Sequence, residues 1–326
     1  MAAEYRMFVS TQQSDLPFVP VCDRPDSRER SSNPLTGGPA TLDSSSQLFC
    51  VWFSATLPDE SPCLLTGVTF VGRDVIVCDN ENKTLKRFDV CGKFHEELFL
   101  RDPCGICSLP NSVEVAVTEP DIRQITVCKL DNSLEVIFEL KTMKKYECIT
   151  SYQDKYVVGC CQLGATCVDF IDSNGTVLRT IPGTLDGQIL FRNPAAIACQ
   201  TSGDVVISDP GACALTCITP NTKIKFSKSM SERPSGVCVD YKGSIYVAQY
   251  DANLVYKLSK TGCKDGVVVD RKQKLTSPLA MSVNGSLLAV TEETPSDKIF
   301  IIQLPGLQSN SEESETSLST LCYNTV

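Results

Sequence analysis

Short segments in which apolar and polar residues alternate recur along most of the chain, separated by turns rich in Gly, Asn and Asp. The clearest stretch is GVCVDYKGSIYVAQYDANLVYKLSKTG, residues 236–262, which holds three such segments joined by a Lys-Gly turn and an Asp-Ala-Asn corner. Alternation with a period of two is typical of β-strands with one buried face. Because no substantial helical pattern is visible, the sequence predicts an all-β fold.

One of these segments belongs to a set of six related pentads. They are VIVCD (75–79), VAVTE (115–119), YVVGC (156–160), VVISD (205–209), IYVAQ (245–249) and LAVTE (288–292). Most are preceded by a short strand that opens with Pro and a small residue, and are followed by further alternating strands. Four short strands in every ~40–45 residues is the period of a propeller blade. The sequence therefore predicts a six-bladed β-propeller.

The sixth copy shows only three strands and ends at Leu304, so one strand is missing. The segment QLFCVWFSATL (47–57), which holds the only tryptophan, Trp52, alternates well and lies before the first blade. We expect it to pair with the last blade and close the ring, because closure removes an exposed sheet edge.

The two ends of the chain have a different composition, rich in Ser and charged residues and with little periodicity. Such segments bury too little apolar surface to fold alone. We expect a disordered tail over 1–45, the propeller over 46–304 with its closing strand within 46–62, and an acidic, Ser-rich tail over 305–326.

The stretches GVCVDYKGSIYVAQYDANLVYKLSKTG and GVTFVGRDVIVCDNENKTLKRFDVCGK are similar to NHL repeats. These repeats form six-bladed propellers, best known at the C-terminal end of tripartite-motif (TRIM) proteins. The Asp that closes the second strand of the repeat is kept at 79 and 209, and is replaced by Glu119, Glu292, Gln249 and Cys160 in the other copies. The resemblance implies a scaffold or substrate-recognition role.

The zinc modules of tripartite-motif proteins, the RING and the B-box, need many Cys and His residues. Residues 1–62 hold only Cys22 and Cys50 as cysteines and no histidine. The chain also shows no coiled coil. Any ubiquitin-ligase activity is therefore expected from another chain that acts together with this one.

The net charge and the cysteine content indicate which partners and which cellular compartment to expect. The 30 Lys and Arg residues against 39 Asp and Glu give a net charge of −9, which does not favour binding to DNA. No apolar run reaches the ~18 residues of a membrane helix, and the first residues do not resemble a secretory signal. Most of the 18 cysteines fall in apolar strand-like runs. We therefore expect a cytoplasmic protein with reduced, buried thiols.

Candidate metal and catalytic groups are few. Cys104 and Cys107 form a CxxC pair, but structural zinc needs four ligands, and Cys213 and Cys217 belong to another blade. The single histidine, His95, lies on a predicted outer strand, a poor place for a general base. We expect no metal, no cofactor and no enzymatic activity.

Two interpretations exist for the acids that close the second strands, Asp79, Glu119, Asp209 and Glu292. In propeller lactonases and lyases, acids around the channel hold a metal ion. In the NHL repeat the Asp mainly caps a turn by accepting bonds from nearby backbone N–H groups. We favour capping, and a propeller hydrolase or lyase is the less favoured alternative.

Loops between blades and the corners between second and third strands should share one face of a propeller. The candidate binding residues on that face are Arg101, Arg123, Lys144, Lys145, Arg192, Arg233 and Lys272. Many acids should lie among them, and loop aromatics are few: Tyr146, Phe191 and Tyr250. We expect a protein partner there; a solvated rim and a single-stranded RNA site, which some members of the family have, are the alternatives.

Overall fold

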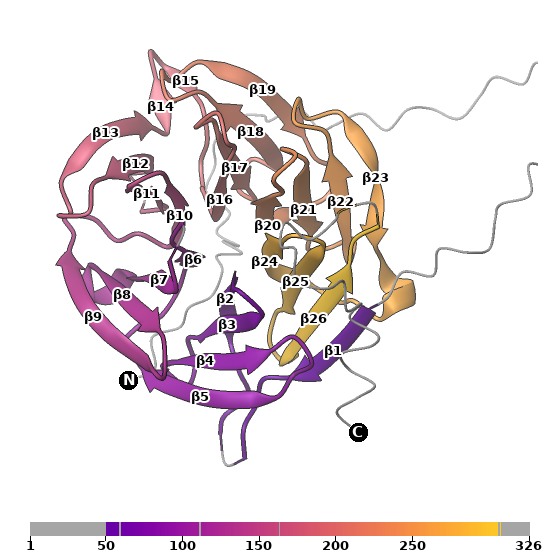
Figure 1. The fold of residues 1–326 in the computed structure, drawn as a ribbon. Helices are drawn as coiled ribbons and strands as arrows, with labels where there is room; N and C mark the ends of the chain where they lie inside the picture. Colours follow the sequence, from indigo (N-terminus) through magenta and orange to yellow (C-terminus); the bar gives the residue numbers. More distant parts are fainter. Residues whose placement is uncertain (1–49, 59, 111, 163, 306, 308–326) are drawn as a thin grey trace, which may run out of the picture. The chain divides into compact units, whose positions relative to one another are not determined.

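Six antiparallel four-stranded sheets surround a central axis in the computed structural model, which describes residues 50–307 except 59, 111, 163 and 306 (Figure 1). Each sheet is one blade. Blades one to three comprise β2 (Leu65–Val71), β3 (Asp74–Asp79), β4 (Thr84–Asp89), β5 (Phe94–Phe99); β6 (Ile106–Ser108), β7 (Glu114–Glu119), β8 (Gln124–Leu130), β9 (Leu134–Lys141); and β10 (Cys148–Tyr152), β11 (Lys155–Cys160), β12 (Cys167–Ile171), β13 (Val177–Pro182).

The remaining blades continue the same order from the axis outward. Blades four to six comprise β16 (Ala196–Cys199), β17 (Val205–Asp209), β18 (Ala214–Ile218), β19 (Ile224–Ser229); β20 (Pro234–Val239), β21 (Ile245–Gln249), β22 (Leu254–Leu258), β23 (Lys264–Val269); and β24 (Pro278–Asn284), β25 (Leu287–Glu292), β26 (Lys298–Gln303), β1 (Cys50–Ser54). The six predicted pentads fall on the second strands of the six blades. The only helical elements in the described residues are two 3-10 turns, η1 (Pro120–Ile122) and η2 (Arg271–Gln273).

The ring closes as the sequence predicts. Strand β1 pairs antiparallel with β26, with Val51 opposite Ile301 and Phe53 opposite Ile299. The innermost strands touch their neighbours around the ring, and β24 contacts β2. Two hydrogen bonds reinforce this junction, from Asn284 Nδ2 to the carbonyl of Gly72 at 2.9 Å and from Thr291 Oγ1 to the carbonyl of Leu65 at 3.1 Å.

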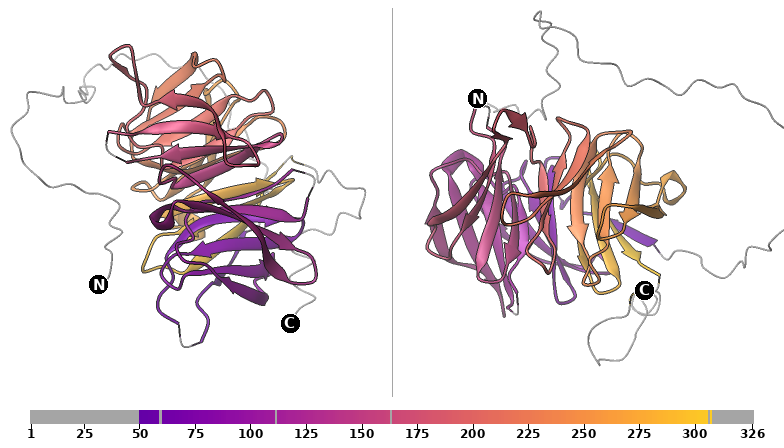
Figure 2. Two further views of the ribbon diagram at one scale, coloured as in Figure 1. Left: turned by 90° about the vertical axis from the view of Figure 1, so that its left-hand side faces the viewer. Right: turned by 90° about the horizontal axis from the view of Figure 1, so that it is seen from above.

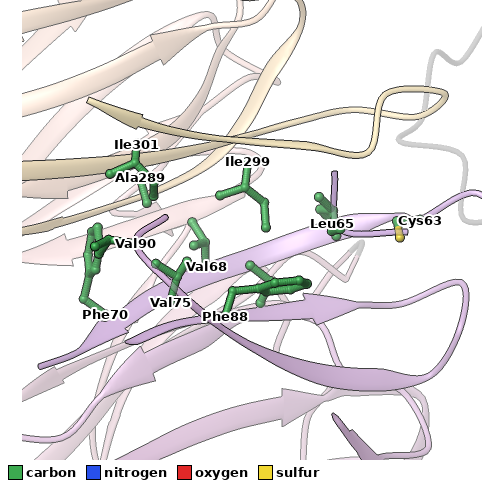
Figure 3. Packing of buried hydrophobic residues seen from close by; sticks show 12 residues of the cluster. Cys63, Leu65, Val68, Phe70, Val75, Phe88, Val90, Ala289, Ile299 and Ile301 are labelled. Carbon is green, nitrogen blue, oxygen red and sulfur yellow. The ribbon is translucent and has the colours of Figure 1, made fainter. Parts of the chain in front are cut away.

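The hydrophobic core lies between adjacent blades. At the closing junction, Val68 and Val75 of blade one pack in one cluster with Ala289 and Ile301 of blade six (Figure 3). Each buried Val or Ile contributes roughly 1.5–3 kcal/mol relative to an exposed one, so the period-two pattern supplies much of the drive to stack the blades. The predicted tails lie almost entirely outside the described residues.

The longest spacing between pentads, from 156 to 205, has a structural cause. A two-stranded hairpin, β14 (Thr184–Leu185) and β15 (Gln188–Ile189), is inserted between blades three and four. Its turn residues Asp186 and Gly187 both have positive φ, at 50° and 78°. The hydrophobic pattern of the sequence does not predict this hairpin. No helix in the described residues is long and apolar enough to cross a membrane.

The corners after the second strands keep one backbone geometry although their sequences differ. The fourth residue after the closing position has positive φ in five blades: Lys83 (φ 59°), Arg123 (φ 52°), Gly164 (φ 80°), Cys213 (φ 47°) and Asn253 (φ 57°). A non-glycine residue in this region costs of order 1 kcal/mol or more. Its recurrence shows that the corners are repeated structural units.

Candidate binding face

The strands cross the thickness of the ring, so the connections gather on its two faces (Figure 2). The front face is defined here by the loops that lead into the inner strands together with the corners between second and third strands. Contacts join these two kinds of loop: Lys145 Nζ in the loop before β10 lies 2.8 Å from Asp121 Oδ1 in the corner after β7. Similarly, Arg233 before β20 contacts Asp251 after β21 at 2.7 Å. The back face carries the other connections.

The acids that close the second strands cap the loops leading into their own blades. The backbone N–H groups of Leu64, Arg101, Arg192 and Thr276 donate to Asp79, Glu119, Asp209 and Glu292, respectively. All four acids are buried. These carboxylates hold backbone groups that would otherwise lack partners, which is the capping role expected from the sequence.

The two blades without an acid at this position use other groups. In blade three, where Cys160 closes β11, the direction of the bond is reversed. The carboxylate belongs to the loop before β10 and the N–H to the corner after β11: Glu147 Oε2 accepts the N–H of Cys161 at 2.9 Å. In blade five, Gln249 Nε2 donates to the carbonyl of Glu232 at 3.4 Å. The corner-to-loop connection is therefore kept while the residues that make it change.

A cluster of metal-ligand type exists in blade one, where Glu60, Cys63 and Asp79 bring their ligand atoms within 4.8 Å of one another. The ammonium of Lys86 already occupies it. Lys86 Nζ lies 2.6 Å from Glu60 Oε2 and 2.8 Å from Asp79 Oδ2, and also contacts Cys63 Sγ at 3.4 Å. The positive charge that this cluster requires is thus supplied by the protein itself.

The same contacts shift the acid-base properties of the pair. Although burial opposes both charged forms, the mutual hydrogen bond lowers the pKa of Asp79 below its usual value and raises the pKa of Lys86. Both groups therefore stay ionised at neutral pH. The sequence analysis missed Lys86, because nothing in the alternation of TLKRFD distinguishes an inward-facing lysine from a solvent-facing one.

All seven candidate binding residues lie in front-face loops or corners, but they differ in availability. Three of them are engaged with carboxylates: Lys144 with Asp169 at 2.7 Å, Lys145 with Asp121, and Arg233 with Asp251. Arg233 makes two bonds to Asp251, from Nε and from Nη2. The fields of these cations are partly neutralised at close range.

Four candidates remain exposed on the same face: Arg101, Arg123, Arg192 and Lys272. Within the described part of the chain, their side chains take part in no ion pair. Exposed carboxylates that take part in no ion pair among the described residues, such as Glu81 and Glu232, lie in the same loops and corners, so the face presents separated charges of both signs. An arrangement of this kind favours charge complementarity with a protein surface over general attraction to phosphate.

The aromatic side chains of the front-face loops are mostly inaccessible. Tyr146 and Phe191 are both buried, at 2% exposure each. Tyr250 is covered by the guanidinium of Arg233, whose central carbon lies 4.9 Å from the ring centroid. Since sequence-tolerant RNA binding depends on stacking bases upon exposed aromatics, this face offers little for it.

A second buried network, also missed from the sequence, lies in blade three beneath Lys144. Asp169 is fully buried and accepts bonds from Lys144 Nζ at 2.7 Å, Tyr146 Oη at 2.5 Å and Thr180 Oγ1 at 2.6 Å. Although burial opposes it, the bond to Asp169 raises the pKa of Lys144. Lys144 is thus held in place by the blade and does not reach freely into solvent.

The other candidate catalytic and zinc-binding residues, the histidine and the cysteines, do not form a common site in the described residues. His95 is exposed on β5, on the outer wall of blade one and away from the front-face loops. Burial raises the pKa of both Cys104 and Cys107 to about 12, which disfavours the thiolate form that zinc requires. No disulfide joins any of the cysteines that the structure describes.

Comparison with known proteins supports the fold. No family model matches the sequence, and no curated protein matches it significantly. Among solved structures, a virginiamycin B lyase from Staphylococcus aureus is similar over 79% of this chain and 100% of its own, with a TM-score of 0.57 and 14% identity. A putative gluconolactonase is similar over 79% of this chain and 93% of its own, with a TM-score of 0.60 and 15% identity.

A third similar structure is a complex of nidogen and laminin. The match covers 68% of this chain and 85% of that one, with a TM-score of 0.55 and 16% identity. At such identities the likeness concerns the fold, which these comparisons and the blade topology establish as a six-bladed propeller.

Proposed function

We propose that this propeller is a non-catalytic protein-interaction module, a scaffold or a substrate-recognition domain, whose partner binds the front face. One observation carries the proposal. The buried carboxylates of that face are committed to backbone N–H groups, whereas its exposed side chains are separate cations and acids on rigid corners. Rigidly held charges of both signs give an interface specificity without providing a reactive centre.

The enzymatic alternative has less support in this chain, although two of the similar structures are a lyase and a putative gluconolactonase. A hydrolase or lyase of this fold would need acids or histidine around the channel that are available to a metal or a substrate. Here the acids at the strand ends bind backbone, and the one histidine lies on an outer strand. Elemental analysis of the purified protein tests this alternative: a stoichiometric divalent ion would favour it.

The resemblance of the repeats to NHL propellers of tripartite-motif proteins suggests the setting of this interaction. On that basis we place the protein in the cytoplasm, where it would present a substrate to a ubiquitin ligase carried by another chain. The nidogen–laminin complex illustrates that a similar propeller occurs in a protein–protein complex. The corner sequences of this chain differ from the repeat pattern, so its partner need not be one that binds other members.

The experiment is an affinity isolation from the protein's own cells, done with and without nuclease treatment. The proposal predicts that a stoichiometric protein partner remains after nuclease, and that the purified partner binds directly to the purified propeller. Loss of all partners on nuclease treatment would instead favour the single-stranded RNA alternative.

A further inference from the structure

Two cysteines of blade three face each other across the last pair of a β-ladder. Cys160 is the final residue of β11, Cys167 is the first residue of β12, and the two are register partners. Directly opposed residues of an antiparallel pair have Cα atoms about 4.5–5.5 Å apart, which falls within the range that a disulfide spans. Both side chains lie in the same buried cluster, and Cys167 influences the acidity of Cys160.

Charged groups surround this thiol pair. Lys144 Nζ lies 3.1 Å from Cys167 Sγ, and Asp169 Oδ2 lies 3.7 Å from the same sulfur. An adjacent ammonium stabilises a thiolate, and an adjacent carboxylate can accept a thiol proton. The pair therefore has next to it both groups that thiol oxidation uses.

The acidity of the pair distinguishes it from other buried cysteines. The interaction with Cys167 lowers the pKa of Cys160 to about 7, and the charge of Lys144 acts in the same direction, while the same interaction raises the pKa of Cys167. Burial instead raises the pKa of Cys107 and Cys128 to about 12. At neutral pH Cys160 therefore carries more thiolate than Cys107 or Cys128.

We propose that Cys160 and Cys167 are a redox-active dithiol that a peroxide converts into an intramolecular disulfide. The thiolate sulfur of Cys160 attacks one peroxide oxygen and the O–O bond breaks, which gives a sulfenic acid. The hydroxide that leaves takes up the proton that the Cys160 thiol had released and becomes the first water. Cys167 then passes its proton to Asp169, and its sulfur attacks the sulfenic sulfur. The S–S bond forms, the S–O bond breaks, and the leaving hydroxide takes up the proton. In sum, two thiols and one hydrogen peroxide give one disulfide and two waters.

The burial of Cys160 and Cys167 determines which reagents can reach their sulfurs. Both thiols are almost fully buried, with 0% and 3% exposure, although the chain neighbours Gln162 and Gly164 are exposed on the front face. Such burial favours a reagent as small as hydrogen peroxide over a bulky one. Bulky maleimides should instead label the exposed Cys213 and Cys263 first.

The test uses the full-length chain in its native state. Peroxide treatment, alkylation of the remaining thiols under denaturing conditions and cleavage between the two cysteines, after Leu163, should yield two peptides joined through Cys160 and Cys167. Mass spectrometry should show the loss of two hydrogens. If both cysteines of the treated protein are alkylated as fully as those of the untreated protein, the proposal is wrong.

Variants separate this pair from its neighbours. Cys161→Ser changes the adjacent thiol, which bonds the carbonyl of Pro194 and not the pair, and it should leave the crosslink intact. Lys144→Met should slow crosslinking severalfold at pH 7, because the ammonium that lowers the pKa of Cys160 is lost. A crosslink that requires Cys161, or a rate unchanged in Lys144→Met, would contradict the chemistry proposed.

Discussion

Lys86 Nζ lies 2.8 Å from Asp79 Oδ2 within blade one, and neither side chain is exposed to solvent. The same Asp79 caps the loop that leads into the blade, through the N–H of Leu64. A buried charge pair and a structural cap therefore share one carboxylate. Removing the lysine would leave this acid buried without its counter-charge, a situation that proteins tolerate poorly.

The first prediction concerns this pair. Lys86→Met should lower the free energy of unfolding by about 3–5 kcal/mol, the usual cost of removing one partner of a buried pair. Urea denaturation followed by circular dichroism measures it. Lys129→Met is the matched control, because Lys129 pairs with Asp131 at an exposed site, and its effect should stay within about 0.5 kcal/mol. Equal effects of the two variants would contradict the buried role of Lys86.

The second prediction follows from the lowered pKa of Asp79. A carboxyl group whose folded pKa lies below its unfolded pKa of about 4 stabilises the fold fully above that value, and the contribution disappears as pH falls through the folded pKa. The melting temperature of the natural protein should therefore fall below pH 4. Asp79→Asn, which lacks this titration, should show a flatter pH dependence there, whatever its absolute stability. Parallel melting curves between pH 2 and pH 5 would show that Asp79 does not contribute.

The third prediction tests the closing strand. Phe53 of β1 packs against Phe88 of blade one, with ring centroids 5.2 Å apart, while its neighbour Trp52 points outward and is 49% exposed. Phe53→Ala should cost about 2–3 kcal/mol, somewhat less than a fully buried phenylalanine. Trp52→Ala should cost under about 1 kcal/mol. Unfolding by urea provides both values, and a larger loss for Trp52→Ala would mean that the strand is not seated as described.

The fourth prediction concerns nucleic acid. Three of the candidate cations are paired with carboxylates and the loop aromatics are covered, so the protein should not bind a random single-stranded RNA pool even at low salt. Fluorescence anisotropy with a labelled pool measures this. Salt-sensitive binding that disappears in a Lys144→Glu, Lys145→Glu, Arg233→Glu variant would favour the RNA-binding alternative.

The sequence predicted the fold well because the propeller depends on a repeated local pattern. The pentads VIVCD and IYVAQ are second strands of their blades, and QLFCVWFSATL contains the strand that closes the ring. Short segments of fixed period bury one face against the next blade wherever they occur. The hairpin at 184–189 was missed because its two-residue strands are too short to show a period.

The candidate site was harder to predict because pairing depends on the third dimension. The sequence places Lys144 and Asp169 in different strands and loops, and only the fold brings them to 2.7 Å. Tyr146 was expected among the loop aromatics, but its ring is buried and its hydroxyl bonds Asp169. The replacement of a closing acid by Cys160 was visible in the sequence, and its register partner Cys167 was the signal that could have revealed the thiol pair.

Charge-reversal variants on the two faces of the ring test directly whether the protein partner binds the front face. The front-face variant carries Arg101→Glu, Arg123→Glu and Arg192→Glu, and the matched control carries Lys93→Glu, Lys223→Glu and Lys260→Glu, three exposed lysines of the back face with the same change in charge. Binding of the isolated partner to each purified variant is measured by calorimetry. If the partner binds the front face, its affinity should be at least tenfold weaker, by about 1.4 kcal/mol, for the front-face variant and unchanged for the control. Equal affinities of both variants, or a loss confined to the back-face variant, would contradict front-face binding.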